Sequence, residues 1–393
     1  MGKYQLIAAT GCPTGIAHTY MAQEALEQAA RKKGITIKVE THGQIGIENE
    51  LTAEEIKQAD AVIIAADKDV HSKRFAGKRV IDVSVSTGIK DAQRLIDEAL
   101  AGKGTILADK EATSEDIIQF KQMVSQYLTP YASAILLDPE YGLPAAALRE
   151  KECGLLLAYE KTGYDTKMPG RLPDLLNIWS VKRLKEAGAD ACKFLLYYDV
   201  DEPAEINVQK QIVIERIGSE CEAEGIPFFL EILSYDAAIG DPSSLAYAKV
   251  KPHKVIEAMR EFSKERYQVD VLKVEVPVNM RFVEGYGQET CYSQAEASAY
   301  FYEQSKVTEQ PFIFLSAGVN ATLFQDTLLF AKQSGSTFNG VLCGRATWAK
   351  GVAPFVTEGE EKASSWMLEE GKQNIKELST LLKETATPVY VDR

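Results

Sequence analysis

The sequence predicts an α/β protein in which two parallel β-sheets, each covered by helices, follow one another along the chain. Short apolar runs alternate with segments of helical spacing over nearly all of the 393 residues, and this alternation is typical of parallel sheets. A Gly-Lys-Gly sequence at 102–104 marks a plausible junction between the two parts. The length also favours two or three domains.

The composition is that of an ordinary soluble protein, with 45% hydrophobic and 26% charged residues. A formal net charge of -13 argues against a nucleic-acid-binding protein, although it leaves room for a local basic site for phosphate. No apolar run approaches the roughly 20 residues of a membrane helix, and the N-terminus does not resemble a signal peptide. We therefore expect a cytoplasmic protein.

Cysteine and histidine usage argues against a metal site. The six cysteines are scattered without paired spacing, which is typical of a reducing compartment. Three of the four histidines lie early in the chain, so the second half contains only His253. We expect no metal and no other cofactor.

A small doubly wound sheet is expected over residues 1–102. Its first step is a buried strand at 4–10, a glycine-containing turn at 11–19 and a helix at 20–33 that ends at Gly34. The remaining elements are predicted as strands at 35–41, 61–66 and 79–85 and helices at 53–58 and 91–101.

Cys12 lies in this first turn, just before the first helix. The positive end of a helix dipole favours the thiolate form of a cysteine. Backbone N–H groups of the turn, with the hydroxyls of Thr14 and Thr19, are suited to hold a phosphoryl group on the sulfur. Glycines at 11 and 15 allow the backbone to approach closely. A buried structural cysteine in a tight turn is the alternative.

The segment 12–19, Cys-Pro-Thr-Gly-Ile-Ala-His-Thr, resembles the IIB domain of the fructose-type bacterial sugar phosphotransferase system. The resemblance covers roughly residues 3–102 and extends to four further segments, at 39–43, 46–49, 65–67 and 74–75. It implies that Cys12 receives a phosphoryl group from a phosphorylated IIA domain and passes it to sugar in a membrane IIC partner.

The same resemblance implies a phosphocysteine loop made by Pro13, Thr14, Gly15 and His18. His18 is equally consistent with a histidine on the helix surface. The sequence does not decide between these two interpretations of His18.

The second part, residues 113–393, is expected to begin with a helix at 113–128 after a linker at 103–112. Alternating strands and helices over about 285 residues favour a (β/α)8 barrel of the TIM type, with an open doubly wound sheet as the alternative. Strands are predicted at 133–138, 154–159, 191–198, 227–233, 271–276, 312–316 and 339–343. Helices are predicted at 179–188, 208–224, 252–263, 293–306 and 321–335.

The stretch 270–277 places two charged residues in a strand that is otherwise apolar. Lys273 and Glu275 are two residues apart, so we expect both side chains on the same face of the strand. Charged residues are seldom buried without a partner. A half-exposed strand is the alternative to a functional lysine.

In a barrel of this type the catalytic groups lie inside and toward the C-terminal ends of the strands. That rule selects Asp138, Lys193, Glu231, Lys273, Ser316, Gly318, Gly344 and Arg345. Any of the charged residues among them could instead form a structural ion pair, and for Asp138 that alternative is as good as a functional role.

Two lysines and a glutamate without metal ligands indicate amine chemistry on a carbonyl group. A lysine attacks a ketone only when it is neutral, and both burial and a second cation lower its pKa. Lys193 is the candidate second cation beside Lys273, and Glu231 is the candidate for proton transfer. Ser316 and Gly318 after one strand, and Gly344 and Arg345 after the next, are suited to a phosphate dianion. A phosphorylated ketose is the expected substrate.

These segments closely resemble the class I tagatose 1,6-bisphosphate aldolase family over roughly residues 111–393. The segments that carry the resemblance are 135–144, 157–163, 193–199, 228–231, 272–277, 315–319 and 340–348. The resemblance implies that Lys273 forms the Schiff base, that Glu231 and Lys193 line the pocket, and that Ser316, Gly318, Gly344 and Arg345 hold phosphate. Dihydroxyacetone phosphate and glyceraldehyde 3-phosphate would be the products.

The chain departs from that family at its start. The family begins with a strand that ends in an Asp-Gln-Arg-Gly motif, and this sequence has no such motif. We therefore expect seven strands in place of eight, two unpaired strand edges and a solvated inner face. Residues 105–109 are considered as a substitute first strand. An inactive barrel, either in a protein that works only in phosphotransfer or in a phosphosugar-binding regulator, is the alternative function. The sequence leaves open whether the chain forms a homo-oligomer.

Overall fold

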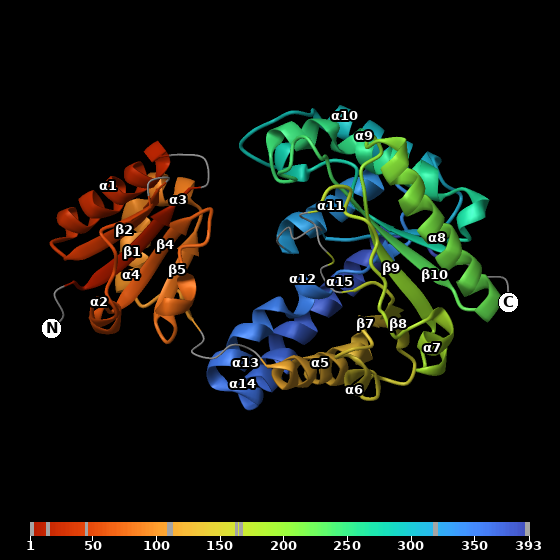
Figure 1. The fold of residues 1–393 in the computed structure, drawn as a ribbon, viewed down its shortest axis with the longest axis horizontal. Coiled ribbons are helices and arrows are strands. Elements are labelled where there is room, and N and C mark those ends of the chain that lie inside the picture. Colours follow the sequence, from red (N-terminus) through yellow and green to blue (C-terminus); the bar gives the residue numbers. More distant parts are fainter. Residues whose placement is uncertain are drawn as a thin grey trace. The chain divides into compact units, whose positions relative to one another are not determined.

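The computed structural model describes residues 4–12, 16–43, 46–107, 113–161, 164, 168–316 and 321–389. The chain divides into two compact units, and the N-terminal part of unit 1 is coloured red to orange in Figure 1. Unit 1 contains Met1–Thr113 with Ala353–Glu360, and unit 2 contains Ser114–Val352 with Glu361–Arg393. Each unit has its own β-sheet. None of the helices in the described ranges combines the length and the apolar composition that a membrane span requires.

The sheet of unit 1 has six strands in the order β3-β2-β1-β4-β5-β6. The four central strands are parallel, and the edge strands β3 and β6 run antiparallel to their neighbours. The strands are β1 (Leu6–Gly11), β2 (Ile37–Gly43), β3 (Gly46–Glu48), β4 (Ala61–Ala66), β5 (Arg79–Val83) and β6 (Thr105–Ile106). The helices are α1 (Ile16–Lys33), α2 (Ala53–Gln58), α3 (Val85–Lys90) and α4 (Ala92–Leu100).

Both faces of this sheet are covered, as expected for a doubly wound fold. One face packs against α1 and α4, through a core that includes Leu26 and Leu95. The other face forms a second core that includes Ile56 and Phe75. The sequence missed the short strand β3 and the helix α3, and it expected β5 to be the last strand of the sheet.

The suggestion that residues 105–109 complete the barrel is wrong for the part that the structure describes. Thr105 and Ile106 form β6, which pairs antiparallel with β5 of unit 1. Those two residues were also expected in the linker, so the first domain extends beyond residue 102. Asp109 lies outside the described residues.

The sheet of unit 2 has seven strands, all parallel, and their order in the sheet follows their order in the chain. This is the strand order of a TIM-type barrel with one strand missing, and it excludes the doubly wound alternative, in which the strand order reverses. The strands are β7 (Ala134–Leu137), β8 (Gly154–Ala158), β9 (Ala191–Tyr198), β10 (Phe228–Ser234), β11 (Val271–Val274), β12 (Phe312–Phe314) and β13 (Gly340–Val341).

Helices alternate with these strands, and Figure 1 shows α8 and α9 running alongside β9 and β10. The helices up to β13 are α5 (Ser114–Leu128), α6 (Leu143–Ala146), α7 (Val181–Glu186), α8 (Ala204–Glu224), α9 (Leu245–Phe262), α10 (Gln294–Lys306) and α11 (Ala321–Gln333). After β13 come α12 (Gly344–Trp348), α13 (Val352–Glu358), α14 (Glu360–Trp366) and α15 (Lys372–Thr385).

The two faces of the seven-stranded sheet differ in burial. Side chains that point toward the helices, such as Phe194, Leu230 and Phe314, are fully buried in the main core. Their neighbours on the inner face, such as Leu195 and Phe229, are only partly buried. A closed barrel fills its interior with packed layers of side chains. In the described residues β7 and β13 each pair on one side only, so the expectation of two unpaired edges is confirmed. The inner face is solvated only in part, because Lys193 and Lys273 on that face are buried.

Contacts between helices join the two ends of this open sheet. Phe120 of α5, which precedes β7, packs edge-to-face on Trp348 of α12, which follows β13, with ring centroids 5.8 Å apart. The hydroxyl of Ser379 in α15 lies 3.5 Å from the carbonyl oxygen of Tyr131, between α5 and β7. The helical layer therefore bridges the position at which the strands do not pair.

Buried lysines on α8 and α9 anchor carboxylates at the C-terminal ends of the strands. Lys254, which is 2% exposed, contacts Asp199 after β9 and lies 3.0 Å from Asp236 after β10. Lys210 lies 3.0 Å from Glu202 in the same way. Because each buried carboxylate has a lysine partner, the loops at this end of the sheet are held without an uncompensated charge.

We predict that Lys254→Met lowers the free energy of unfolding of unit 2 by about 3–5 kcal/mol, because it leaves buried carboxylates without their cation. All three tryptophans lie in unit 2, so tryptophan fluorescence during guanidinium unfolding reports on that unit alone. The control is Lys264→Met, which removes an exposed ion pair with Glu261 and should cost less than about 1 kcal/mol. Equal losses in the two variants would contradict the prediction.

Candidate functional site

The inner face of the seven-stranded sheet carries a row of alternating carboxylates and ammonium groups. Glu231 on β10 is paired in register with Lys273 on β11, and its two carboxylate oxygens each lie 2.7 Å from a lysine Nζ, one from Lys273 and one from Lys193 on β9. Lys193 also contacts Glu160, which follows β8. All four side chains belong to residues that are less than 10% exposed. Three neighbouring strands and the loop after a fourth thus share one buried charge network.

The two lysines of this network differ in the direction of their pKa shifts. Burial disfavours the charged form of Lys193, but Glu160 and Glu231 more than compensate and raise its pKa above the ordinary lysine value. Burial lowers the pKa of Lys273, and the neighbouring Lys193 ammonium adds to that effect, while Glu231 opposes it. Lys193 is therefore the permanent cation, and Lys273 is the amine that loses its proton more readily.

The strand ends on the other side of Lys273 carry the predicted phosphate ligands. Ser316 follows β12 and is partly exposed, and Gly344 and Arg345 are the exposed first two residues of α12. Burial raises the pKa of Cys343, just before Gly344, to about 12, and the charge of Lys273 opposes this shift. The influence of Lys273 on Cys343 indicates that α12 begins near the lysine. Gly318 lies outside the described residues.

Two carboxylates selected from the sequence have other partners. Asp138 forms an ion pair with Lys121 of α5 and accepts a hydrogen bond from the backbone N–H of Tyr141, so its contacts are those of the structural alternative. β11 ends at Val274, so the two-residue alternation does not extend to Glu275. The carboxylate of Glu275 lies 3.0 Å from Lys251 of α9, away from the network of Lys273. The expectation that these two residues share a face is therefore wrong.

In unit 1, Cys12 is buried at the end of β1, and α1 begins four residues later. Pro13, Thr14 and Gly15, between β1 and α1, lie outside the described residues. His18 is exposed in the first turn of α1. The strand before Cys12 and the helix after it are thus present, and the helix begins at Ile16, earlier than the predicted residue 20.

Beside Cys12 lies a polar network that sequence reasoning did not select. His42 on β2 is paired in register with Gly11, directly before Cys12, and its ring contacts the buried carboxylate of Glu40. Arg74 binds both oxygens of the same carboxylate, and its contact to Oε2 measures 2.9 Å. The sequence feature that could have revealed this network is the pair of polar residues Glu40 and His42, two apart in an otherwise buried strand.

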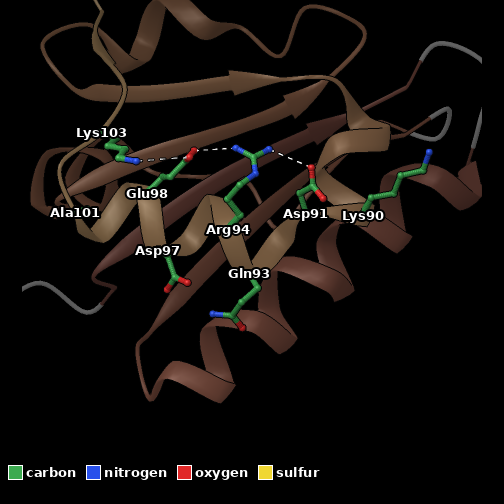
Figure 2. A pocket seen from close by; sticks show the side chains of 8 residues that line it. All are labelled: Lys90, Asp91, Gln93, Arg94, Asp97, Glu98, Ala101 and Lys103. Carbon is green, nitrogen blue, oxygen red and sulfur yellow. Dashed lines mark hydrogen bonds and ion pairs between the residues drawn. The ribbon is translucent and has the colours of Figure 1, made fainter. Parts of the chain in front are cut away.

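A surface hollow of unit 1 lies along α4 (Figure 2). It measures about 650 Å³, and Figure 2 shows charged side chains that pair with one another. Arg94 lies 3.1 Å from Asp91 and 3.1 Å from Glu98. Exposed pairs of this kind are ordinary on a helix surface. We assign no function to this hollow.

A sequence profile described as "DeoC/LacD family aldolase" matches residues 62–350, which is more than two thirds of the chain. The chain belongs to this aldolase family. A second profile, described as "PTS system, Lactose/Cellobiose specific IIB subunit", matches residues 7–98. The combination of a phosphotransferase IIB domain and an aldolase that the sequence predicted is thereby confirmed.

The aldolase relatives are close in sequence. Tagatose 1,6-diphosphate aldolase 1 of Enterococcus faecalis is 66% identical over 295 residues, which are 75% of this chain and 91% of the relative. Tagatose 1,6-diphosphate aldolase 2 of the same organism is 63% identical and covers 79% of this chain and 95% of the relative. Other relatives of the same description come from Streptococcus mutans and Streptococcus agalactiae, at 62% and 60% identity.

Solved structures agree with the fold of the aldolase part. A fructose-bisphosphate aldolase from Plasmodium falciparum aligns with a TM-score of 0.52 at 15% identity, covering 94% of this chain and 97% of that chain. At this level of identity the likeness concerns the fold alone.

A structure described as a domain of fruA from Bacillus subtilis is 49% identical to part of this chain, with a TM-score of 0.25, and covers 26% of this chain and 98% of that chain.

Within this member of the aldolase family, Glu160 is the network residue that the sequence did not predict. It lies just beyond the predicted end of the strand at 154–159, and it pairs with Lys193. The segment 157–163 had been noted only for its resemblance. The signal was a glutamate that immediately follows an apolar strand, as the carboxylates of parallel strand ends commonly do.

We predict that the pH at which Lys273 becomes reactive depends on Lys193. In the wild type, imine formation with dihydroxyacetone phosphate should rise with pH as Lys273 loses its proton, with a midpoint below the ordinary lysine value of about 10.4. Lys193→Met removes a cation that lowers the pKa of Lys273, so the midpoint should move to higher pH. At pH values below both midpoints, the rate of trapping should fall about tenfold for each pH unit by which the midpoint moves upward.

The measurement is the initial rate of borohydride-trapped adduct at a series of pH values. Lys193→Arg keeps the cation and should keep the midpoint near that of the wild type. A midpoint in Lys193→Met that is unchanged or lower would contradict the assigned role of Lys193, provided that circular dichroism shows a folded protein.

Proposed function

We propose that unit 2 is a class I aldolase that cleaves a ketose 1,6-bisphosphate through a Schiff base on Lys273. The observation that carries this proposal is the network in which Lys193 is held charged and Lys273 is favoured as the neutral amine. A lysine attacks a carbonyl group in its unprotonated form, and burial beside a second cation lowers its pKa in the direction that favours this form.

The proposed reaction begins when the amine of Lys273 adds to the C2 carbonyl of the ketose and water leaves, which gives an iminium ion. A base removes the proton of the C4 hydroxyl, the C3–C4 bond breaks, and its electron pair neutralises the iminium as an enamine. Glyceraldehyde 3-phosphate leaves first. The enamine is then protonated at C3, and water releases dihydroxyacetone phosphate and regenerates the amine.

Glu231 is the proposed proton carrier, because each of its oxygens is 2.7 Å from a lysine Nζ and it therefore lies beside the forming imine. The two lysines lower the pKa of Glu231 despite its burial, so it is a carboxylate while both lysines are charged. Conversion of Lys273 into the neutral amine weakens that effect and makes Glu231 more basic. We propose Ser316, Gly318, Gly344 and Arg345 as ligands of the phosphate nearer the carbonyl. Asp138, which is paired with Lys121, is not proposed as a ligand.

We propose tagatose 1,6-bisphosphate as the substrate, because the relatives at 60–66% identity bear the name tagatose 1,6-diphosphate aldolase. Import by phosphotransfer yields a ketose 1-phosphate, and a kinase then supplies the bisphosphate. Such a substrate is formed and consumed inside the cell, so we also propose a cytoplasmic location.

For unit 1 we propose phosphoryl transfer through Cys12. The thiolate attacks the phosphorus of a phosphohistidine on a IIA domain, the P–N bond breaks as the P–S bond forms, and the phosphoryl group then passes to sugar in a membrane IIC partner. Pro13, Thr14, Gly15 and His18 are the proposed loop of the phosphocysteine. We propose that this domain ends after β6 and that the aldolase begins near residue 113, with a linker between them.

The decisive test of the aldolase is trapping at Lys273. We predict that dihydroxyacetone phosphate with borohydride leaves one covalent adduct on the wild type and that peptide mass spectrometry places it on Lys273. Lys273→Arg should abolish the adduct and reduce cleavage of the bisphosphate by at least about 10³-fold, since arginine stays protonated. Absence of an adduct on the wild type would reject the proposal.

The alternative is a protein in which only phosphotransfer works. The specific observation in its favour is the open seven-stranded sheet, whose inner face is partly solvated and which lacks the first strand of the family. This alternative requires that trapping at Lys273 fails while phosphoryl transfer continues.

Phosphotransfer is tested with labelled phospho-IIA. We predict a label on the wild type and on Lys273→Arg, and no label on Cys12→Ser, because the hydroxyl of serine is a far weaker nucleophile than a thiolate. The wild type and Cys12→Ser should trap dihydroxyacetone phosphate equally. A label that persists in Cys12→Ser would show that another residue accepts the phosphoryl group.

A further inference from the structure

The loop after β8 holds Arg171 in a strained conformation. Its φ of 41° is in the left-handed region, which residues other than glycine rarely adopt, and it follows Gly170 with φ 80°. A Cβ on Gly170 would lie 3.0 Å from a side-chain carbon of Ile206 in α8, and the carbonyl of Gly170 accepts a hydrogen bond of 3.2 Å from the hydroxyl of Tyr235. The backbone before Arg171 is therefore fixed on two sides, and strain of this kind occurs preferentially at ligand sites.

The guanidinium of Arg171 is stacked on aromatic rings, and within the described ranges it forms no ion pair. Its central carbon lies 4.1 Å from the ring centroid of Tyr235 and 5.5 Å from that of Tyr197. Among the described residues no carboxylate pairs with it. Nearby Glu202 is bound by Lys210 and by the hydroxyl of Tyr235. Stacking holds the guanidinium plane and leaves its in-plane N–H groups available to an anion.

The position of Arg171 relative to Lys273 suits a long substrate. Tyr197 lies on β9 four residues beyond Lys193, so it shares the inner face and lies roughly 13 Å further toward the C-terminal end. Gly344 and Arg345 follow β13, on the opposite side of β11 in the sheet order. Lys273 is thus placed between two cationic positions. An extended six-carbon chain with a phosphate at each end measures roughly 11 Å between its phosphorus atoms from ordinary bond lengths.

We propose that Arg171 binds the second phosphate of the substrate, the phosphate monoester on the far side of the cleaved bond. This inference rests on the proposed function and extends it by a residue that confers specificity for a ketose bisphosphate over a ketose 1-phosphate. The guanidinium fork donates two hydrogen bonds to the phosphate dianion, while Tyr197 and Tyr235 hold its plane. Arg171 touches the leaving fragment and none of the atoms that react.

The test compares the wild type with Arg171→Gln in the full chain, with tagatose 1,6-bisphosphate and tagatose 1-phosphate as the two ligands. Calorimetry should show that the variant binds the bisphosphate 10- to 100-fold more weakly and the 1-phosphate within about twofold of the wild type. The same split should appear in KM, with a smaller change in kcat. Arg183→Gln is the matched control, because Arg183 is also stacked, 5.2 Å from the ring centroid of Trp179, but is exposed.

Equal weakening for both ligands in Arg171→Gln would show a structural role of the loop and overturn the proposal, as would unchanged binding of the bisphosphate. A wild type that binds the bisphosphate no more tightly than the 1-phosphate would overturn it as well. Trapping of dihydroxyacetone phosphate at Lys273 separates the two proposals, because that ligand carries only one phosphate. Loss of trapping in a wild type that still prefers the bisphosphate would reject the aldolase and keep the phosphate site.

Discussion

The buried charge network of Glu160, Lys193, Glu231 and Lys273 is the constraint on which the inner face of the aldolase part depends. Four ionisable groups without solvent are stable only when their charges compensate, and here two carboxylates face two amines. The compensation is unequal, because Lys193 has two carboxylate neighbours and Lys273 has one. This asymmetry of position raises the pKa of Lys193 and lowers that of Lys273, although the two side chains are chemically identical.

A second set of buried ion pairs lies outside the network of Glu160, Lys193, Glu231 and Lys273, and its lysines come from different elements. Lys210, Lys251 and Lys254 come from the outer helices α8 and α9 and bind carboxylates at the strand ends. The lysines of the inner network come instead from the strands themselves. A buried lysine therefore does not by its residue type alone indicate which carboxylates it contacts. Its position on an outer helix or on a strand decides that. Glu275 illustrates this point, because it is two residues from Lys273 and yet is bound by a lysine from α9.

The sequence predicted most of the fold, since alternating apolar runs and helical segments are local signals. It located seven parallel strands and identified Lys273, Glu231 and Lys193 from charges inside apolar strands. It failed where the partner is distant in the chain: Lys121 with Asp138, Lys251 with Glu275 and Glu160 with Lys193 are all side-chain contacts between separate elements. It also misjudged the last strand of unit 1, because two residues at 105–106 carry too little pattern to reveal their pairing with β5.

The unpaired sides of β7 and β13 affect behaviour at high protein concentration. A strand with a partner on one side only retains backbone N–H and C=O groups that a strand from another molecule can satisfy. An eight-stranded closed barrel has no such groups, whereas this seven-stranded sheet has two rows of them, bridged by the packing of α5 against α12. Addition of a strand from a second molecule at either edge would satisfy these groups, so concentrated solutions of the open sheet favour self-association.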